Sequence, residues 1–101
     1  MRMRIESMLS HGKENGIRRE ELARLLGTDE RSLRRQIQRE RKAGALIMAD
    51  CKNGYFLPSS EADIRRFVKS MSRRAREIEE VSYMAEKTLA QMTGQEMIQG
   101  W

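Results

Sequence analysis

The sequence predicts a mainly α-helical fold with one small β-hairpin, an α+β class, followed by a long C-terminal helix. Three observations support this prediction. Apolar residues recur at helical spacing up to Ala43, the period changes between Ala45 and Pro58, and no helix breaker follows until Gly94. We divide the chain into an N-terminal domain (1–58), a long helix (59–92) and a tail (93–101). A chain of 101 residues has room for one core.

The first two predicted helices each have one apolar face. The first covers residues 2–10, with Ile5, Met8 and Leu9 on that face. The second covers residues 20–26, where the apolar residues are Leu22, Ala23, Leu25 and Leu26. Between them we expect a polar loop at 13–16 and a very short strand or anchor at Ile17.

A third helix is predicted over residues 28–43. Gly27 suits the left-handed conformation that closes the preceding helix, and Thr28 is a good N-cap. Asp29 and Glu30 then lie in the first turn, where the helix dipole favours negative charge. Leu33, Ile37 and the stem of Arg41 should face inward.

The change of period after Ala45 predicts the hairpin. Residues 46–48 and 55–57 are short β-prone runs, and Asn53-Gly54 between them is a strong hairpin signal because both residue types tolerate positive φ. Pro58 ends the second strand. Ser59 or Ser60 should then cap the long helix, with Asp63 completing a capping box.

Two helices joined at a glycine form a helix-turn-helix, and residues 19–38 fit its pattern. A hairpin directly after the second helix would be the wing of a winged helix-turn-helix. The residues that carry a family resemblance are Glu20-Glu21-Leu22-Ala23-Arg24-Leu25-Leu26-Gly27, Arg31-Ser32-Leu33-Arg34-Arg35 and Asn53-Gly54-Tyr55-Phe56-Leu57-Pro58. Residues 3–58 resemble the N-terminal winged helix of biotin operon repressors, and the whole chain is similar to short helix-turn-helix proteins of bacterial prophages. The biotin-ligase domain of those repressors is absent, so the resemblance implies DNA binding and no biotin function.

Charge and placement together predict a duplex DNA interface. The net charge is +5 and the pI about 9.9, which favours a polyanionic partner. In this fold the second helix of the motif lies in the major groove, where Arg can bind guanine and Gln adenine. We therefore expect base-edge or nearby phosphate contacts from Arg31, Arg34, Arg35 and Gln38. Contacts to phosphate are expected from Ser32, Arg18 and Arg19, and contacts to a phosphate or to the minor groove from Lys52 and Asn53. The competing interpretation is a solvated basic face.

The long helix carries a coiled-coil-like apolar stripe. One row keeps a seven-residue stride and the other flanks it; together they are Ile64, Phe67, Val68, Met71, Ala75, Ile78, Val81, Ala85, Leu89 and Met92. We expect this stripe to mediate homodimerisation, the alternative being that it folds back as intramolecular core. Basic residues in its first half could extend the phosphate footprint or only solubilise the helix. The tail, with Ile98 and Trp101, could dock on a partner.

No catalytic, metal or cofactor motif is evident. Cys51 has no neighbouring Cys or His, His11 stands alone, and no glycine-rich phosphate loop occurs. We expect no enzyme activity, no cofactor and no membrane segment, and one cysteine suits the cytoplasm. The leading hypothesis is a dimeric prophage transcriptional regulator. The alternative is a non-enzymatic adaptor for phage replication or packaging that uses the long helix and tail. RNA binding has little support without clustered aromatics.

Overall fold

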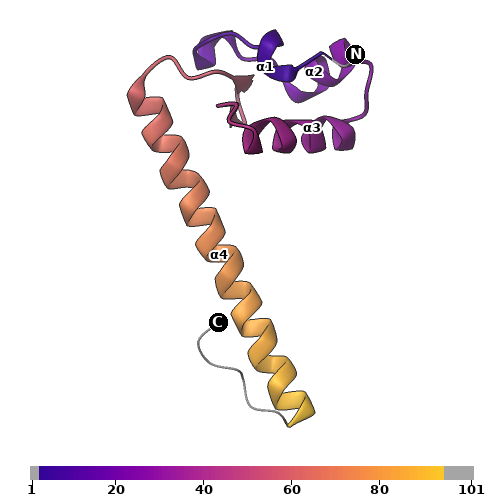
Figure 1. The fold of residues 1–101 in the computed structure, drawn as a ribbon, viewed down its shortest axis with the longest axis vertical. Helices are drawn as coiled ribbons and strands as arrows, with labels where there is room; N and C mark the ends of the chain where they lie inside the picture. The colour runs from indigo at the N-terminus through magenta and orange to yellow at the C-terminus, as the bar shows by residue number, and fades with distance from the viewer. Residues whose placement is uncertain (1–2, 95–101) are drawn as a thin grey trace. The chain divides into compact units, whose positions relative to one another are not determined.

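Within residues 3–94, which the structure describes, three α-helices, a two-stranded hairpin and one long α-helix follow one another (Figure 1). The structure is a computed structural model. Its elements are α1 (Ile5–Met8), a 3-10 turn η1 (Lys13–Asn15), α2 (Arg19–Leu26), α3 (Glu30–Lys42), β1 (Met48–Asp50), β2 (Gly54–Phe56) and α4 (Glu61–Thr93). The predicted α+β class with a long final helix is confirmed.

The chain divides into two compact units, Met1–Arg65 and Arg66–Trp101. We call the first the N-terminal unit. Its boundary lies a few residues after the predicted one at 58, because the first turn of α4 groups with it. Of the predicted tail, only Thr93 and Gly94 belong to the described residues; Ile98 and Trp101 lie outside them.

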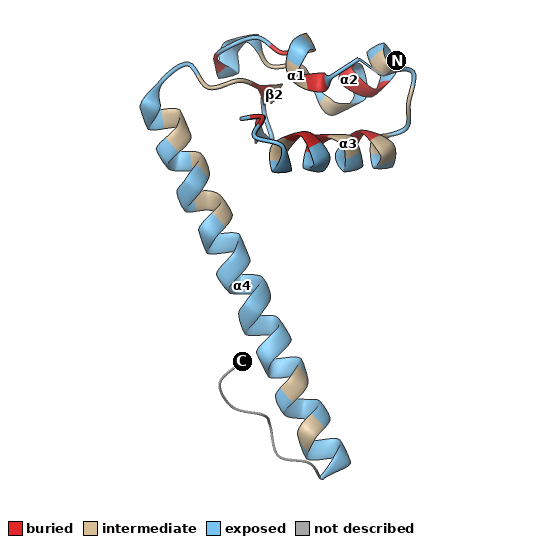
Figure 2. Cartoon of the chain, in the orientation of Figure 1, coloured by how far each residue is buried: buried red, intermediate tan, exposed pale blue. Residues whose placement is uncertain are grey.

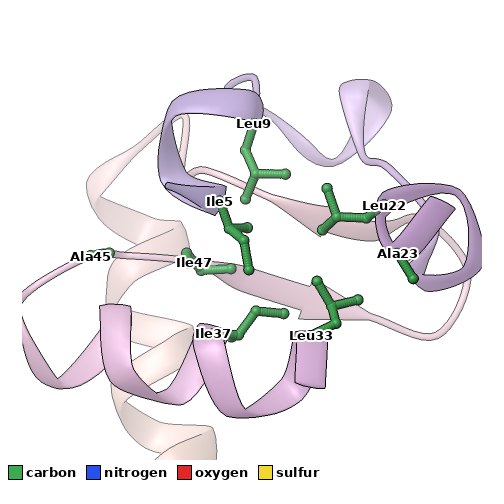
Figure 3. Packing of buried hydrophobic residues seen from close by; sticks show 8 residues of the cluster. All are labelled: Ile5, Leu9, Leu22, Ala23, Leu33, Ile37, Ala45 and Ile47. Carbon is green, nitrogen blue, oxygen red and sulfur yellow. The ribbon is translucent and has the colours of Figure 1, made fainter. Parts of the chain in front are cut away.

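The core of the N-terminal unit is formed by side chains that α1, α2, α3 and the segment after α3 direct toward one another (Figure 3). Leu22 and Leu33 are fully buried, as are Ile5 and Ile47. Each such burial contributes about 1.5–3 kcal/mol of transfer free energy. The predicted inward residues of α2 and α3 are thus confirmed, except that Leu25 is 52% exposed.

A tight turn joins α2 to α3. Gly27 has φ 65° in the left-handed region, as predicted. The backbone N–H of Gly27 donates to Arg24 O at 3.1 Å and that of Thr28 to Ala23 O at 3.0 Å. The prediction that Thr28 caps α3 is wrong, because Thr28 still closes α2. Asp29 is the N-cap, and its Oδ1 accepts from the Ser32 N–H at 2.6 Å.

The hairpin pairs Met48 with Phe56 and Asp50 with Gly54. The first strand therefore begins two residues later than the prediction of 46–48. Its displacement has a physical reason: Arg41 Nε donates to Ile47 O at 2.9 Å, so this carbonyl bonds to α3 and not to β2. The second strand, predicted over 55–57, begins one residue earlier at Gly54 and ends at Phe56.

The hairpin loop is held by an aspartate. Asp50 Oδ1 accepts from the backbone N–H groups of Lys52 and Asn53, and Oδ2 accepts from Asn53 Nδ2 at 2.8 Å. Gly54 has φ 82°, but no described non-glycine residue has positive φ. The expectation that Asn53 shares the positive φ is therefore wrong: residues 51–53 form a three-residue loop, and Gly54 alone turns the chain.

The segment before α2 pairs with the outer edge of β2. Ile17 and Tyr55 exchange two backbone hydrogen bonds of 2.9 and 2.8 Å, and Leu57 N–H donates to Ser10 O at 2.9 Å. The predicted short strand at Ile17 is confirmed as an isolated bridge. At this close approach, a Cβ atom on Gly54 would overlap the carbonyl oxygen of Ile17, and one on Gly16 that of Asn53.

A buried carboxylate joins α3 to α1. Glu40 is only 8% exposed, and it accepts from the N–H groups of Ile5 at 2.8 Å and Glu6 at 2.9 Å. Gln36 Nε2 donates to the same carboxylate at 2.9 Å and to Met3 O at 3.0 Å. Helix α1 covers one turn and not the predicted 2–10. Its first N–H groups are satisfied by this side chain from 35 residues away.

Helix α4 (Glu61–Thr93) begins two residues after and ends one residue after the predicted bounds of 59–92. Ser60 Oγ accepts from the Asp63 N–H at 3.2 Å, and Asp63 Oδ2 accepts from the Ser59 N–H at 3.0 Å. These bonds resemble a capping box shifted by one residue. Gly94, with φ 71°, follows the last helical residue. None of the residues in α4 is buried (Figure 2).

Gly54→Ala should destabilise the protein far more than Gly27→Ala. Both glycines have positive φ, which costs a non-glycine residue about 1–2 kcal/mol, but only Gly54 also lacks space, since nothing lies within 4 Å of the Cβ position at Gly27. We expect about 1 kcal/mol for Gly27→Ala and about 3 kcal/mol or more for Gly54→Ala in urea unfolding. Equal losses would contradict the close pairing of Ile17 with Tyr55.

Glu40→Gln should destabilise the fold at neutral pH. Burial raises the pKa of Glu40, but the N–H groups of Glu6 and Ile5 and the amide of Gln36 outweigh it and hold the pKa below its ordinary value of 4.5. The charged form is thus favoured in the folded state, and its contribution is present above pH 4.5 and lost as pH falls through the lowered folded pKa. We expect a loss of about 1–3 kcal/mol at pH 7.

The difference between wild type and Glu40→Gln should shrink as unfolding is repeated at pH values below 4.5. Glu14→Gln, which removes an exposed carboxylate from η1, is the matched control and should change stability little at any pH. A Glu40→Gln variant as stable as this control at pH 7 would contradict the anchoring role.

Candidate nucleic-acid interface

The outer face of α3 consists of long polar and basic side chains. Leu33, Ile37 and Glu40 occupy the inner face, so the helical period sends their neighbours outward (Figure 2). The four predicted readers are all exposed: Arg31, Arg34, Arg35 and Gln38. They lie on one rigid helix of 13 residues, whose position is fixed by the core beneath it.

Sequence reasoning missed two members of this face, Arg39 and Lys42. Both are exposed in the last turns of α3. Their spacing of four and seven residues from Arg35 was the signal, since positions at that spacing share a helix face. We call the six exposed residues of this helix the α3 basic face: Arg31, Arg34, Arg35, Gln38, Arg39 and Lys42.

The charges of the α3 basic face are largely unpaired within the described chain. Over residues 3–94, Arg34 forms no hydrogen bond or ion pair, and Arg31 and Arg35 form none at contact distance. The Ser32 N–H and hydroxyl hold the pKa of Asp29 below its ordinary range, and the nearby charges of Arg31 and Arg35 add to this effect. Ser32, a predicted phosphate donor, is half-buried and bonded to Asp29.

The two arginines before and at the start of α2 differ in their surroundings. Arg18 is exposed. Arg19 Nε donates to Glu30 Oε1 at 2.9 Å, and this bond raises the pKa of Arg19. The pair joins the first residue of α2 to the first residue of α3. Glu30 is therefore engaged within the protein, and Arg19 has a structural partner besides any phosphate.

The hairpin loop presents a cation at its tip. Lys52 is exposed there. Its backbone N–H donates to Asp50, and its ammonium group forms no ion pair within residues 3–94. Asn53 is half-buried, and its amide donates to Asp50. The structure thus brings Lys52 to the surface and gives Asn53 a role in holding the loop.

The predicted dimerisation residues lie along α4, and they are not core. Ile64, Phe67 and Met71 are half-buried, while Ala75 and Ala85 are exposed. The larger side chains beyond them are more than half exposed, from 58% at Val68 to 80% at Met92: Val68, Ile78, Val81, Leu89 and Met92. Two more large side chains on other faces, Tyr83 and Met84, are exposed as well.

His11 and Cys51 are the remaining sequence candidates, and each stands apart from other reactive groups in the described chain. His11 Nδ1 donates to Pro58 O at 2.7 Å, and Cys51 is an exposed free thiol. Among residues 3–94, no three His, Cys, Asp or Glu side chains gather in a way that could hold a metal ion. No described helix combines the length and apolarity needed to cross a membrane.

Comparison with known proteins adds no relative to these observations. No protein family, curated protein or solved structure matches the chain. The candidate interface therefore depends on its geometry and charge, with the α3 basic face as its main surface.

Proposed function

We propose that the chain is a double-stranded DNA-binding protein of the winged helix-turn-helix type that inserts α3 into the major groove. The observation that carries the proposal is the α3 basic face, whose arginines lie on an exposed helix with few partners of their own. An α-helix fits the major groove, and Arg and Gln side chains reach base edges there. The net charge of +5 favours the same polyanionic partner.

The hairpin supports this assignment as a second contact point. Lys52 at the loop tip is free to meet a phosphate or the minor groove, and Arg18 is exposed before α2. Backbone contacts of this kind position a protein on DNA, whereas base contacts give sequence preference. The proposed role is a transcriptional regulator of a prophage-like gene set, acting in the cytoplasm.

We further propose that the protein acts as a homodimer through α4. A helix of 33 residues with an exposed apolar stripe gains stability when a second helix covers that stripe. Two identical subunits also suit a DNA site with two half-sites. The second candidate function, a protein adaptor, is favoured by Tyr83 and Met84, which are exposed away from the stripe.

Replacing Arg34 and Arg35 together by Ala should weaken duplex DNA binding. We expect affinity to fall about tenfold or more, because good base contacts contribute about 1–3 kcal/mol each. If an arginine instead binds a phosphate, its removal should weaken the salt dependence: the negative slope of log affinity against log salt should become shallower by about 0.9. Fluorescence anisotropy with random duplex at two salt concentrations, followed by selection of preferred sites, measures both effects.

The matched control for this experiment is Arg24→Ala with Lys87→Ala. It removes the same charge from exposed positions outside the α3 basic face. If the control weakens binding as much as the α3 variant does, binding is non-specific. Wild-type protein that binds duplex weakly, without salt dependence or an enriched motif, would remove the DNA-binding proposal in favour of the adaptor.

Light scattering at tens of micromolar protein should return twice the 11.8 kDa of one chain. Ile78→Glu, which puts a charge in the stripe, should shift the mass toward one chain. Tyr83→Glu adds the same charge on another face of α4 and should leave the mass unchanged. The two positions are similarly exposed, Tyr83 at 53% and Ile78 at 63%, so they differ mainly in the face on which they lie. A wild-type mass of 11.8 kDa would end the dimer proposal.

A further inference from the structure

The apolar surface of α4 follows one regular path along the helix. It begins at Ile64, advances in alternate steps of four and three residues, and ends at Met92. Every member is apolar except Ser82. We call these nine positions the α4 seam; their spacing is the 3.5-residue period of a coiled coil. Phe67 and Val81 flank it.

Most of the charges on α4 fall into two blocks; Glu61, Asp63 and Lys87 lie outside them. Residues 65–76 contain six Arg or Lys and no acidic residue. Residues 77–86 contain four Glu and no basic residue. All ten of these side chains are exposed or half-buried, and the blocks meet between Arg76 and Glu77.

We propose that α4 pairs with α4 of a second copy in antiparallel orientation, with the two-fold axis between Arg76 and Glu77. In this arrangement the basic block of each helix lies beside the acidic block of the other. Opposite charges on neighbouring helices then lie within about one Debye length, roughly 8 Å at physiological salt. This inference rests on the proposed homodimer and adds its orientation.

The sizes of the seam residues favour the same arrangement. With the axis at that point, Ala75 faces the second copy's Ile78, and Ser82 faces the second copy's Met71. Small side chains thus meet large ones, which fills the interface evenly. A parallel pair would place Ala75 against Ala75 and Ile78 against Ile78. The two alanines would leave a cavity, and the two isoleucines beside them would be crowded.

Charge disfavours the parallel pair independently. A parallel arrangement would bring two blocks of six cations side by side and two blocks of four carboxylates side by side. Like charges on facing helices select against an orientation, as charged flanks do in coiled coils generally. The antiparallel pair also places the two Ile64 residues about 38 Å apart along the axis, at about 1.5 Å per residue. The two N-terminal units would therefore be attached at opposite ends.

A charge introduced at Ser72 should have opposite effects on dimer affinity in the antiparallel and the parallel pair. Ser72 is exposed beside the seam, and in the antiparallel pair it faces the second copy's Glu79. Ser72→Arg should tighten the dimer and Ser72→Glu should weaken it, each by about two- to tenfold in the dissociation constant, as for exposed ion pairs. In a parallel pair the same position meets the basic block, and the two effects would be reversed. Sedimentation equilibrium of the full chain measures both; reversed effects would overturn the proposal.

Disulfide formation gives a second measurement. In a Cys51→Ser background, we would mix Val68→Cys protein with Ala85→Cys protein under mild oxidation. The antiparallel pair brings these two positions face to face, so the mixed disulfide should form and the Val68→Cys homodisulfide should not. Identical positions would be about 25 Å apart along the axis, at about 1.5 Å per residue, beyond the reach of a disulfide.

The outcomes separate orientation from function. A Val68→Cys homodisulfide, or a dimer that forms no disulfide at either position, would overturn the antiparallel seam whatever the DNA assay gives. The mixed disulfide in a protein that binds no duplex DNA would keep the seam and remove the DNA-binding proposal.

Discussion

The inner face of α3 is the constraint on which the rest of the N-terminal unit depends. Leu33 and Ile37 fill the core, and Glu40 continues the same face by accepting two backbone N–H groups of α1. An ionised carboxylate in this place is stable because several donors surround it. Once these three residues face inward, the helical period directs Arg31, Arg34, Arg35 and Arg39 outward, whereas Arg41 lies at the flank and bonds to Ile47 O.

The turns around this helix fix its ends. Gly27 closes α2, Asp29 caps α3, and the Arg19–Glu30 pair joins the first residues of the two helices. On the other side, β2 is bonded along both edges, to β1 and to the segment that includes Ile17. A short hairpin alone is marginally stable in water, so this second edge is what gives the hairpin loop a defined position.

Sequence reasoning succeeded where one residue type decides a local structure. Gly27, Gly94 and the apolar positions Leu22, Leu33 and Ile37 predicted turn, stop and core because backbone sterics and periodicity are local properties. Sequence reasoning failed where a residue distant in the sequence determines the local structure. Arg41 bonds to Ile47 and shifts the first strand, and Glu40 looks like any solvated carboxylate until α1 lies over it. The α3 basic face could be predicted in outline, but without Arg39 and Lys42, because the helix-turn-helix pattern ends at residue 38 whereas α3 continues to Lys42.

The α3 basic face and the basic block of α4 differ in how many acidic side chains lie near their cations. The acidic side chains at the start of α3, Asp29 and Glu30, are already engaged by Ser32 and Arg19. The basic block of α4, in contrast, is followed directly by an acidic block of similar length. In the proposed antiparallel pair the four carboxylates of the second copy would offset most of the six cations in each basic block. Under the two proposals together, phosphate binding would depend mainly on α3 and the hairpin, and the α4 charges would chiefly orient the dimer.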